Sequence, residues 1–111
     1  MGKRRIPVKD GGEPTDVLQG KPVEAELDLH TLDGMTAEQT LSIFLERVVH
    51  TNPGRVVRVI TGRGNRSAGM PILQPLVRRL LAAEVGNRVN RFVPDAGGGA
   101  FLIEITSSPG P

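Results

Sequence analysis

The chain has 111 residues, the length of one small domain, and its 14 Lys and Arg against 12 Asp and Glu leave a net charge of only +2. It contains no cysteine, which excludes disulfide frameworks, zinc–thiolate sites and thiol nucleophiles. No apolar run is long enough to span a bilayer and no apolar segment follows the basic start, so the composition favours a soluble, cytoplasmic protein without membrane contacts.

The first predicted element is a strand over residues 23–30, in which apolar side chains occupy every second position. It follows an arm over residues 1–22 that is rich in Gly, Pro and charged residues and is expected to be mobile. A capping box at residues 36–39 then opens a helix that ends in the turn-forming residues 52–54. Its apolar face follows the helical repeat: Ala37, Leu41, Phe44, Leu45 and Val48.

A second strand is predicted at residues 55–60, and its two apolar faces are typical of a central position in a sheet. A second helix is predicted over residues 72–84, with a glycine just past its end. The apolar stripe of this helix consists of Leu73, Leu76, Val77, Leu80 and Leu81. Two further strands follow at residues 88–93 and 101–106, and residues 107–111 form a frayed tail.

The element order is therefore β-α-β-α-β-β, within one domain over residues 23–106. Strands joined through a helix are expected to be parallel, with right-handed crossovers. The fold class is α/β, a small two-layer sandwich in which the helices pack on a four-stranded mixed sheet. The loop before the last strand reaches the carboxyl ends of the first two strands only if that last strand runs antiparallel to them, which the sequence leaves open.

Asp28 and His30 form the first candidate site. They lie two residues apart on a strand, so their side chains point to the same side, at the carboxyl end where open α/β sheets place their sites. A carboxylate beside a histidine holds the ring in one tautomer, as a general base requires. The same pair could instead ligate a divalent metal ion, or form a surface hydrogen bond without a function.

The loop after the second strand is the second candidate site. The backbone N–H groups of such a glycine turn can surround an anion, while hydroxyl, amide and arginine side chains add further donors. Alternatively, the glycines only supply a turn with positive φ. The loop is neither a Walker loop nor a dinucleotide fingerprint. Its residues are Thr61, Gly62, Arg63, Gly64, Asn65, Arg66 and Ser67.

A third candidate is the run of Gly97, Gly98 and Gly99 before the fourth strand. Three glycines permit the close approach of a ligand or of another backbone segment, or they form a flexible hairpin loop.

Charge is unevenly distributed along the chain. Residues 22–46 contain six acidic residues and no Lys or Arg, whereas residues 47–94 contain nine arginines and one acidic residue. The planar guanidinium group suits phosphate, but a solvated basic surface would show the same pattern. Charge alone leaves these two interpretations open.

Taken together, the motifs resemble the Smr (small MutS-related) domain family. The matching pieces are LDLH at 27–30, TAEQTL at 36–41, TGRGNRS at 61–67 and GGGA at 97–100, in the order of the family. The resemblance spans residues 23–106. Smr domains are similar in fold to the C-terminal domain of translation initiation factor 3, which agrees with the element order above.

The resemblance implies nucleic-acid binding and, as in several members, endonuclease activity on RNA or DNA. It assigns Asp28 and His30 to cleavage, and the 61–67 loop with Gly97–Gly99 to nucleic-acid binding. RNA cleavage through the 2′-hydroxyl would need no metal ion, whereas DNA cleavage would require an activated water with Mg²⁺ or Mn²⁺. The alternatives are a binding module for nucleic acid, a ribosome or a repair complex without turnover, and an enzyme acting on a small phosphoester.

The chain departs from the family pattern at two places. Three residues, Thr31 to Asp33, separate His30 from Gly34, where members usually have the glycine directly after the histidine. Arg66 stands where many members have a histidine. The first departure bears on the position of His30, and the second removes a side chain that could assist catalysis.

Overall fold

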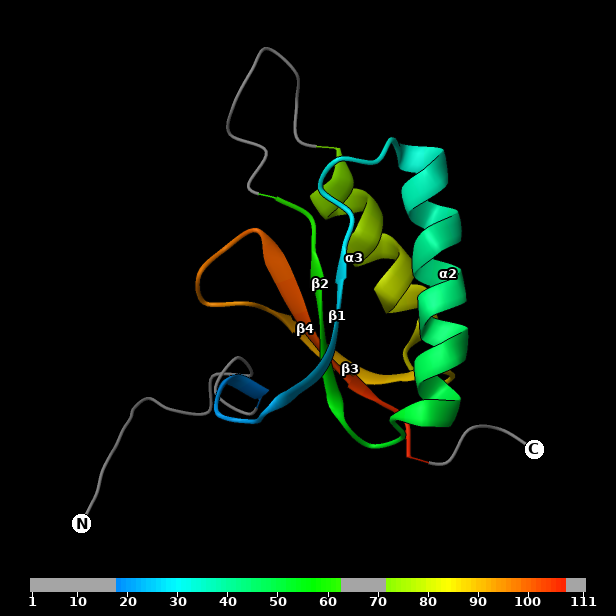
Figure 1. Cartoon of the computed structure of the whole chain (residues 1–111), viewed down its shortest axis with the longest axis vertical. Coiled ribbons are helices and arrows are strands. Elements are labelled where there is room, and N and C mark those ends of the chain that lie inside the picture. Colours follow the sequence, from blue (N-terminus) through cyan, green and yellow to red (C-terminus); the bar gives the residue numbers. More distant parts are fainter. Residues whose placement is uncertain (1–17, 63–71, 108–111) are drawn as a thin grey trace.

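A computed structural model describes residues 18–62 and 72–107 of the chain (Figure 1). The order of elements is β-α-β-α-β-β, as the sequence predicts. The elements are β1 (Val23–Asp28), α2 (Gly34–Thr51), β2 (Val56–Ile60), α3 (Leu73–Glu84), β3 (Val89–Pro94) and β4 (Ala100–Ile105). Observed strand boundaries differ from the predicted ones by one or two residues.

The four strands form one mixed sheet in the order β1-β2-β4-β3. β1 and β2 are parallel, and β4 is antiparallel to both β2 and β3. β2 is therefore central, which confirms the prediction from its two apolar faces. The direction of β4 decides what the sequence leaves open, because Ala100 at the start of β4 pairs with Ile60 at the end of β2.

The main core lies between the sheet and the two helices, which cover one face of the sheet (Figure 1). All five predicted apolar residues of α2 are buried, together with Val49. In α3, Leu73, Val77 and Leu81 are buried, while Leu76 and Leu80 are partly buried and pack against the same core. The helical repeat thus identified the side of each helix that faces the sheet.

A second, smaller cluster lies on the other face of the sheet. Leu18 is fully buried there and packs with Val56, Val93 and Leu102. The packed structure therefore includes residues before the predicted domain boundary at residue 23. The prediction of a mobile arm otherwise concerns residues 1–17, which lie outside the described residues, and the predicted tail lies outside them from residue 108.

The start of α2 corrects the predicted capping box. The helix begins at Gly34, and the N-cap is Asp33, whose Oδ1 accepts a hydrogen bond of 2.8 Å from the backbone N–H of Thr36. Thr36 is thus the third helical residue and not the cap, because an aspartate earlier in the chain satisfies the free N–H group. In the described part of the chain, no helix is long and apolar enough to cross a membrane.

Candidate functional site

Asp28 and His30 form a close pair where β1 ends. Oδ1 of Asp28 accepts a hydrogen bond of 3.0 Å from the backbone N–H of His30 and lies 2.6 Å from Nδ1 of its ring. Both side chains are about half exposed, at 51% and 53%. The backbone and side-chain hydrogen bonds from His30 lower the pKa of the Asp28 carboxyl below its usual range. Asp28 is thus an ionised acceptor, which assigns the ring proton to Nδ1 and leaves Nε2 as the acceptor.

Gly62 supports His30 from the adjacent loop. Its φ is +80°, in the left-handed region, and a Cβ atom at this position would lie 3.1 Å from Cβ of His30. The carbonyl oxygen of Gly62 accepts hydrogen bonds from Nε2 of Gln74, at 3.0 Å, and from Oγ1 of Thr61, at 3.1 Å. A glycine is therefore required here both by the backbone conformation and by the contact with His30.

The Gly97–Gly99 run meets the same loop. The backbone N–H groups of Thr61 and Gly62 both donate to the carbonyl oxygen of Gly99, at 2.8 and 2.9 Å. Gly98 and Gly99 have positive φ values of 78° and 74°, which allow this close approach. The antiparallel direction of β4 thus brings all three predicted motifs to one end of the sheet.

These contacts correct part of the expected anion site. Because the N–H groups of Thr61 and Gly62 are bonded to Gly99, they are not available to a ligand. Arg63, Gly64, Asn65, Arg66 and Ser67 lie outside the described residues.

The insertion after His30 leaves the histidine in contact with the predicted site. Leu29 still donates to the carbonyl oxygen of Ile60 on β2, at 2.7 Å, and Leu32 closes a turn onto Leu29, at 2.9 Å. The last inserted residue, Asp33, caps α2. The extra residues are therefore accommodated between the turn and the helix, while His30 keeps its contacts with Asp28 and Gly62.

An ion-pair bridge that no motif in the sequence indicates joins the strands of the site to the glycine turn. Arg58 on β2 donates from Nη1 to Glu26, at 2.8 Å, and from Nε to Asp95, at 3.0 Å. Asp95 begins the turn that contains Gly98, whose N–H donates to the Asp95 carbonyl oxygen at 2.9 Å. Arg58 thus links β1, β2 and the glycine turn. Its signal in the sequence is a single cation within an otherwise apolar strand.

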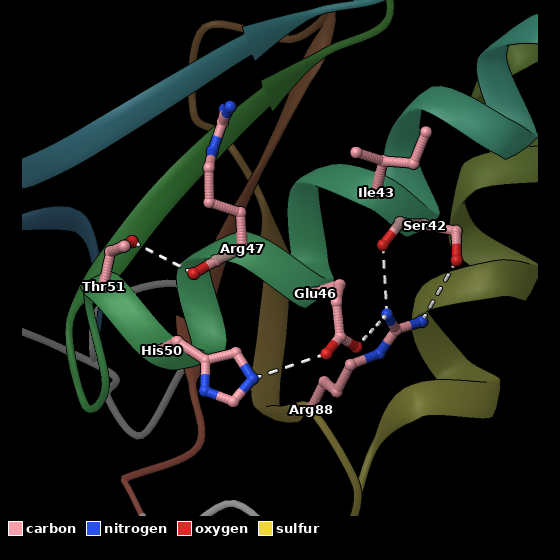
Figure 2. Close-up of a pocket in the computed structure, with 7 residues that line it drawn as sticks. All are labelled: Ser42, Ile43, Glu46, Arg47, His50, Thr51 and Arg88. Atoms are coloured by element: carbon pink, nitrogen blue, oxygen red, sulfur yellow. Dashed lines mark hydrogen bonds and ion pairs between the residues drawn. The ribbon is translucent and has the colours of Figure 1, made fainter.

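A groove of about 630 Å³ lies elsewhere, on the exposed side of α2 (Figure 2). Arg88 lines it, and its Nη1 donates to the carbonyl oxygen of Ser42, at 3.0 Å. The same guanidinium group forms ion pairs with Glu46, at 3.5 Å, and with Glu84, at 2.8 Å. His50, in the last turn of α2, lies 3.4 Å from Glu46. The charge of Arg88 is neutralised by these carboxylates, which makes it a poor contact for phosphate. Arg47 also lines the groove, with its guanidinium carbon 5.8 Å from the centroid of the Phe44 ring.

The described residues contain no group of three or more His, Cys, Asp or Glu side chains placed to hold a metal ion. Two of the acidic residues near His30 in the sequence already have partners. Glu26 pairs with Arg58, and Asp33 caps α2.

Comparisons with known proteins agree with the motifs. A model of the Smr domain family matches residues 27–106. The crystal structure of a human small-MutS related domain is 29% identical, with a TM-score of 0.54, over 72% of this chain and 99% of that one. The solution structure of the SMR domain of NEDD4-binding protein 2 is 30% identical, with a TM-score of 0.59, over 76% of this chain and 88% of that one. No curated protein matches the chain.

Proposed function

The chain belongs to the Smr domain family, and from this premise we propose that it binds nucleic acid and cleaves the phosphodiester backbone, with RNA favoured over DNA. The observation that carries the proposal is the pairing of His30 with Asp28 at the sheet end, against Gly62. The pair is exposed enough to meet a large substrate, and Asp28 orients the ring while Nε2 remains open.

In the proposed reaction, Nε2 of His30 accepts the proton of a ribose 2′-hydroxyl. The 2′-oxygen attacks the adjacent phosphorus, a bond from this oxygen to phosphorus forms, and the bond from phosphorus to the 5′-oxygen breaks. The leaving 5′-oxygen takes a proton from solvent, so the products carry a cyclic phosphate and a 5′-hydroxyl. Asp28 stabilises the imidazolium that forms when His30 is protonated.

The proposed substrate contacts are made mainly to the nucleic-acid backbone. The chain has three aromatic residues, all phenylalanines. Phe44 and Phe101 are buried, and Phe92 packs edge-on against Phe101 with ring centroids 5.9 Å apart. Because these rings belong to the core, none offers a platform on which bases could stack. Recognition of phosphate and shape is the remaining mode.

The 61–67 loop supplies the proposed phosphate contacts. Thr61 and Gly62 connect the loop to Gly99 and to His30. Two arginines, Arg63 and Arg66, follow directly in the sequence and carry the charge that a phosphate requires. We assign the phosphate next to the attacked 2′-hydroxyl to this loop, as the family resemblance implies.

A binding module without turnover is the second candidate function. In the described part of the chain, Asp28 is the one titratable side chain that a hydrogen bond or ion pair joins to His30. Among the residues that the structure describes, no separate general acid is therefore in contact with the ring. Arg66 also replaces the histidine that many family members carry in the loop. Both features favour binding without cleavage, to nucleic acid or to a ribosome or repair complex.

A cleavage assay separates these functions. End-labelled single-stranded RNA and matched single- and double-stranded DNA are incubated with the wild type and with His30→Ala, in EDTA or with Mg²⁺ or Mn²⁺. The proposal predicts RNA cleavage in EDTA that His30→Ala abolishes. Cleavage that depends on the metal ion and includes DNA would indicate an activated water. Binding without cleavage by either protein would favour the binding module.

A further inference from the structure

We propose that Arg78, on α3, is a phosphate contact that extends the nucleic-acid interface from the His30 site along one flank of this helix. The proposal rests on the function proposed above and adds the path that the substrate backbone takes away from the site. The ligand class is a phosphodiester chain, read without regard to base sequence.

The position of Arg78 follows from the contact between Gln74 and the site. Gln74, in the first turn of α3, donates to the carbonyl oxygen of Gly62, at 3.0 Å, and Gly62 in turn lies against His30. Residues four apart on a helix are neighbours on the same side. Arg78 therefore lies next to Gln74, about 6 Å further along the helix axis. This advance is comparable to the rise of about two nucleotides along one strand.

The flank that carries Gln74 and Arg78 faces away from α2. Leu76 and Leu80 occupy the opposite flank, where Leu76 lies 3.6 Å from a Cβ built on Gly34 of α2. Leu80 lines the groove between the two helices. Because the α2 side of α3 is occupied by these leucines, Arg78 lies on the other flank, the one whose Gln74 contacts Gly62.

Arg78 is also an available cation. It is exposed, and the described residues offer it no ion pair. Three other arginines are engaged in ion pairs: Arg58 with Glu26 and Asp95, Arg88 with Glu84, and Arg91 with Glu104. The exposed Arg55 and Arg79 have no ion pair with a described residue either, so the position of Arg78 beside Gln74 is what distinguishes it. A guanidinium group without a protein partner keeps its full charge and its bidentate geometry for a phosphate.

The charges on the other side of the site would direct a phosphate chain toward α3. The sheet face below His30 carries Glu24, Glu26 and Asp28 along β1, with Asp95 beside them. Arg58 offsets only part of this negative charge. A polyanion at His30 is thus repelled along β1 and attracted along the Arg78 flank.

The test is the salt dependence of binding to a fluorescein-labelled single-stranded RNA of mixed sequence. Kd is measured by fluorescence anisotropy over a range of KCl concentrations for the wild type and for Arg78→Ala. Loss of one phosphate contact is expected to weaken binding about two- to tenfold and to lower the slope of log Kd against log salt by about 0.7 to 1. Arg78→Lys keeps the charge and is expected to restore the slope.

Two controls remove the same charge elsewhere. Arg79→Ala changes an exposed neighbour on the same helix, about 100° further around its axis. Arg55→Ala changes an exposed arginine just before β2, at the opposite end of that strand from His30. Both variants are expected to keep the wild-type slope. Equal losses for Arg78, Arg79 and Arg55 would show a diffuse charge effect and would overturn the assignment.

The outcomes also separate this inference from the proposed function. Salt-dependent binding by the wild type with an unchanged slope in Arg78→Ala overturns the Arg78 contact alone. If the wild type binds neither the RNA nor a DNA strand of the same sequence at low salt, the proposed function fails, and the inference fails with it. Circular dichroism confirms that each variant is folded.

Discussion

The two carboxylates Asp28 and Glu104 lie on the same face of the sheet but have very different surroundings. Asp28 is half exposed and touches one partner, His30, whose Nε2 faces away from the contact. Glu104 is 8% exposed, and its oxygens accept hydrogen bonds from Asn90, from Arg91 at 2.9 Å and from Lys21 at 3.2 Å. The first group has capacity left for a ligand, and the second does not.

The difference separates a reactive site from a structural one. Burial by itself would raise the pKa of Glu104, but the hydrogen bonds from Asn90, Arg91 and Lys21 outweigh it and hold the pKa below its ordinary value. Asp28 reaches a lowered pKa mainly through the backbone and side chain of His30. Changes at Asp28 should therefore slow cleavage with little effect on stability. Changes at Glu104 should lower stability with little effect on cleavage.

The largest effect is expected for Asp28→Asn, which removes the carboxylate that orients His30. The amide can present its N–H group to the ring and favour the wrong tautomer, so RNA cleavage should slow by about 10²-fold or more. Single-turnover cleavage rates measure this. Asp33→Asn is the matched control, because it removes a nearby charge while asparagine still caps α2. Equal rates for Asp28→Asn and Asp33→Asn would argue against the orienting role.

Glu104→Gln should lower stability and leave RNA cleavage nearly unchanged. It keeps the side-chain shape but removes the charge that Lys21 and Arg91 share, so the free energy of unfolding should fall by about 1–3 kcal/mol. Chemical denaturation measures the loss. Glu24→Gln, on the exposed part of β1, should change it by less than about 0.5 kcal/mol. A large loss of cleavage in folded Glu104→Gln would contradict the separation of the two regions.

Gly62→Ala tests the contact that joins the loop to the histidine. A side chain at φ of 80° is strained, and the added Cβ would lie 3.1 Å from Cβ of His30. Stability should decrease by about 1–2 kcal/mol, and cleavage should decrease as His30 is displaced. Gly86→Ala has a similar φ of 91° but open space around it, so it serves as the control for strain alone. If both variants cleave equally well, the contact with His30 does not matter.

The smallest expected effect is the pH dependence of stability. Glu104 has a lowered pKa in the folded state, so its contribution is fully present above its ordinary value of 4.5. It is lost as the pH falls from there through the folded-state pKa, where the carboxylate is protonated. Thermal unfolding from pH 7 to pH 3 should show this loss in the wild type and less of it in Glu104→Gln. Identical pH dependence of stability in the wild type and in Glu104→Gln would contradict this role of Glu104.

Much of this architecture could be predicted from local patterns. Alternation and the helical repeat identified the strands and the core side of α2, and the two apolar faces of residues 55–60 placed β2 in the centre. The direction of β4 could not be predicted, because a strand pattern is the same in either direction. This direction is what brings Gly99 to Thr61.

Other features depend on partners distant in sequence. Arg58 and Asp95 are 37 residues apart, and no local pattern indicates their bond. Leu18 is a single apolar residue in a polar segment, without the periodicity that would predict its burial. The choice of Asp33 over Thr36 as the cap of α2 also required the structure, since both residue types are good caps.

The most direct test of the central claim measures binding and cleavage of one RNA by the wild type and His30→Ala under the same conditions. His30 is half exposed, so its removal should leave the fold and the affinity nearly unchanged. The account predicts that His30→Ala binds the RNA with a similar Kd and does not cleave it. Cleavage by His30→Ala at the wild-type rate would contradict the assignment of the Asp28–His30 pair as the site of chemistry.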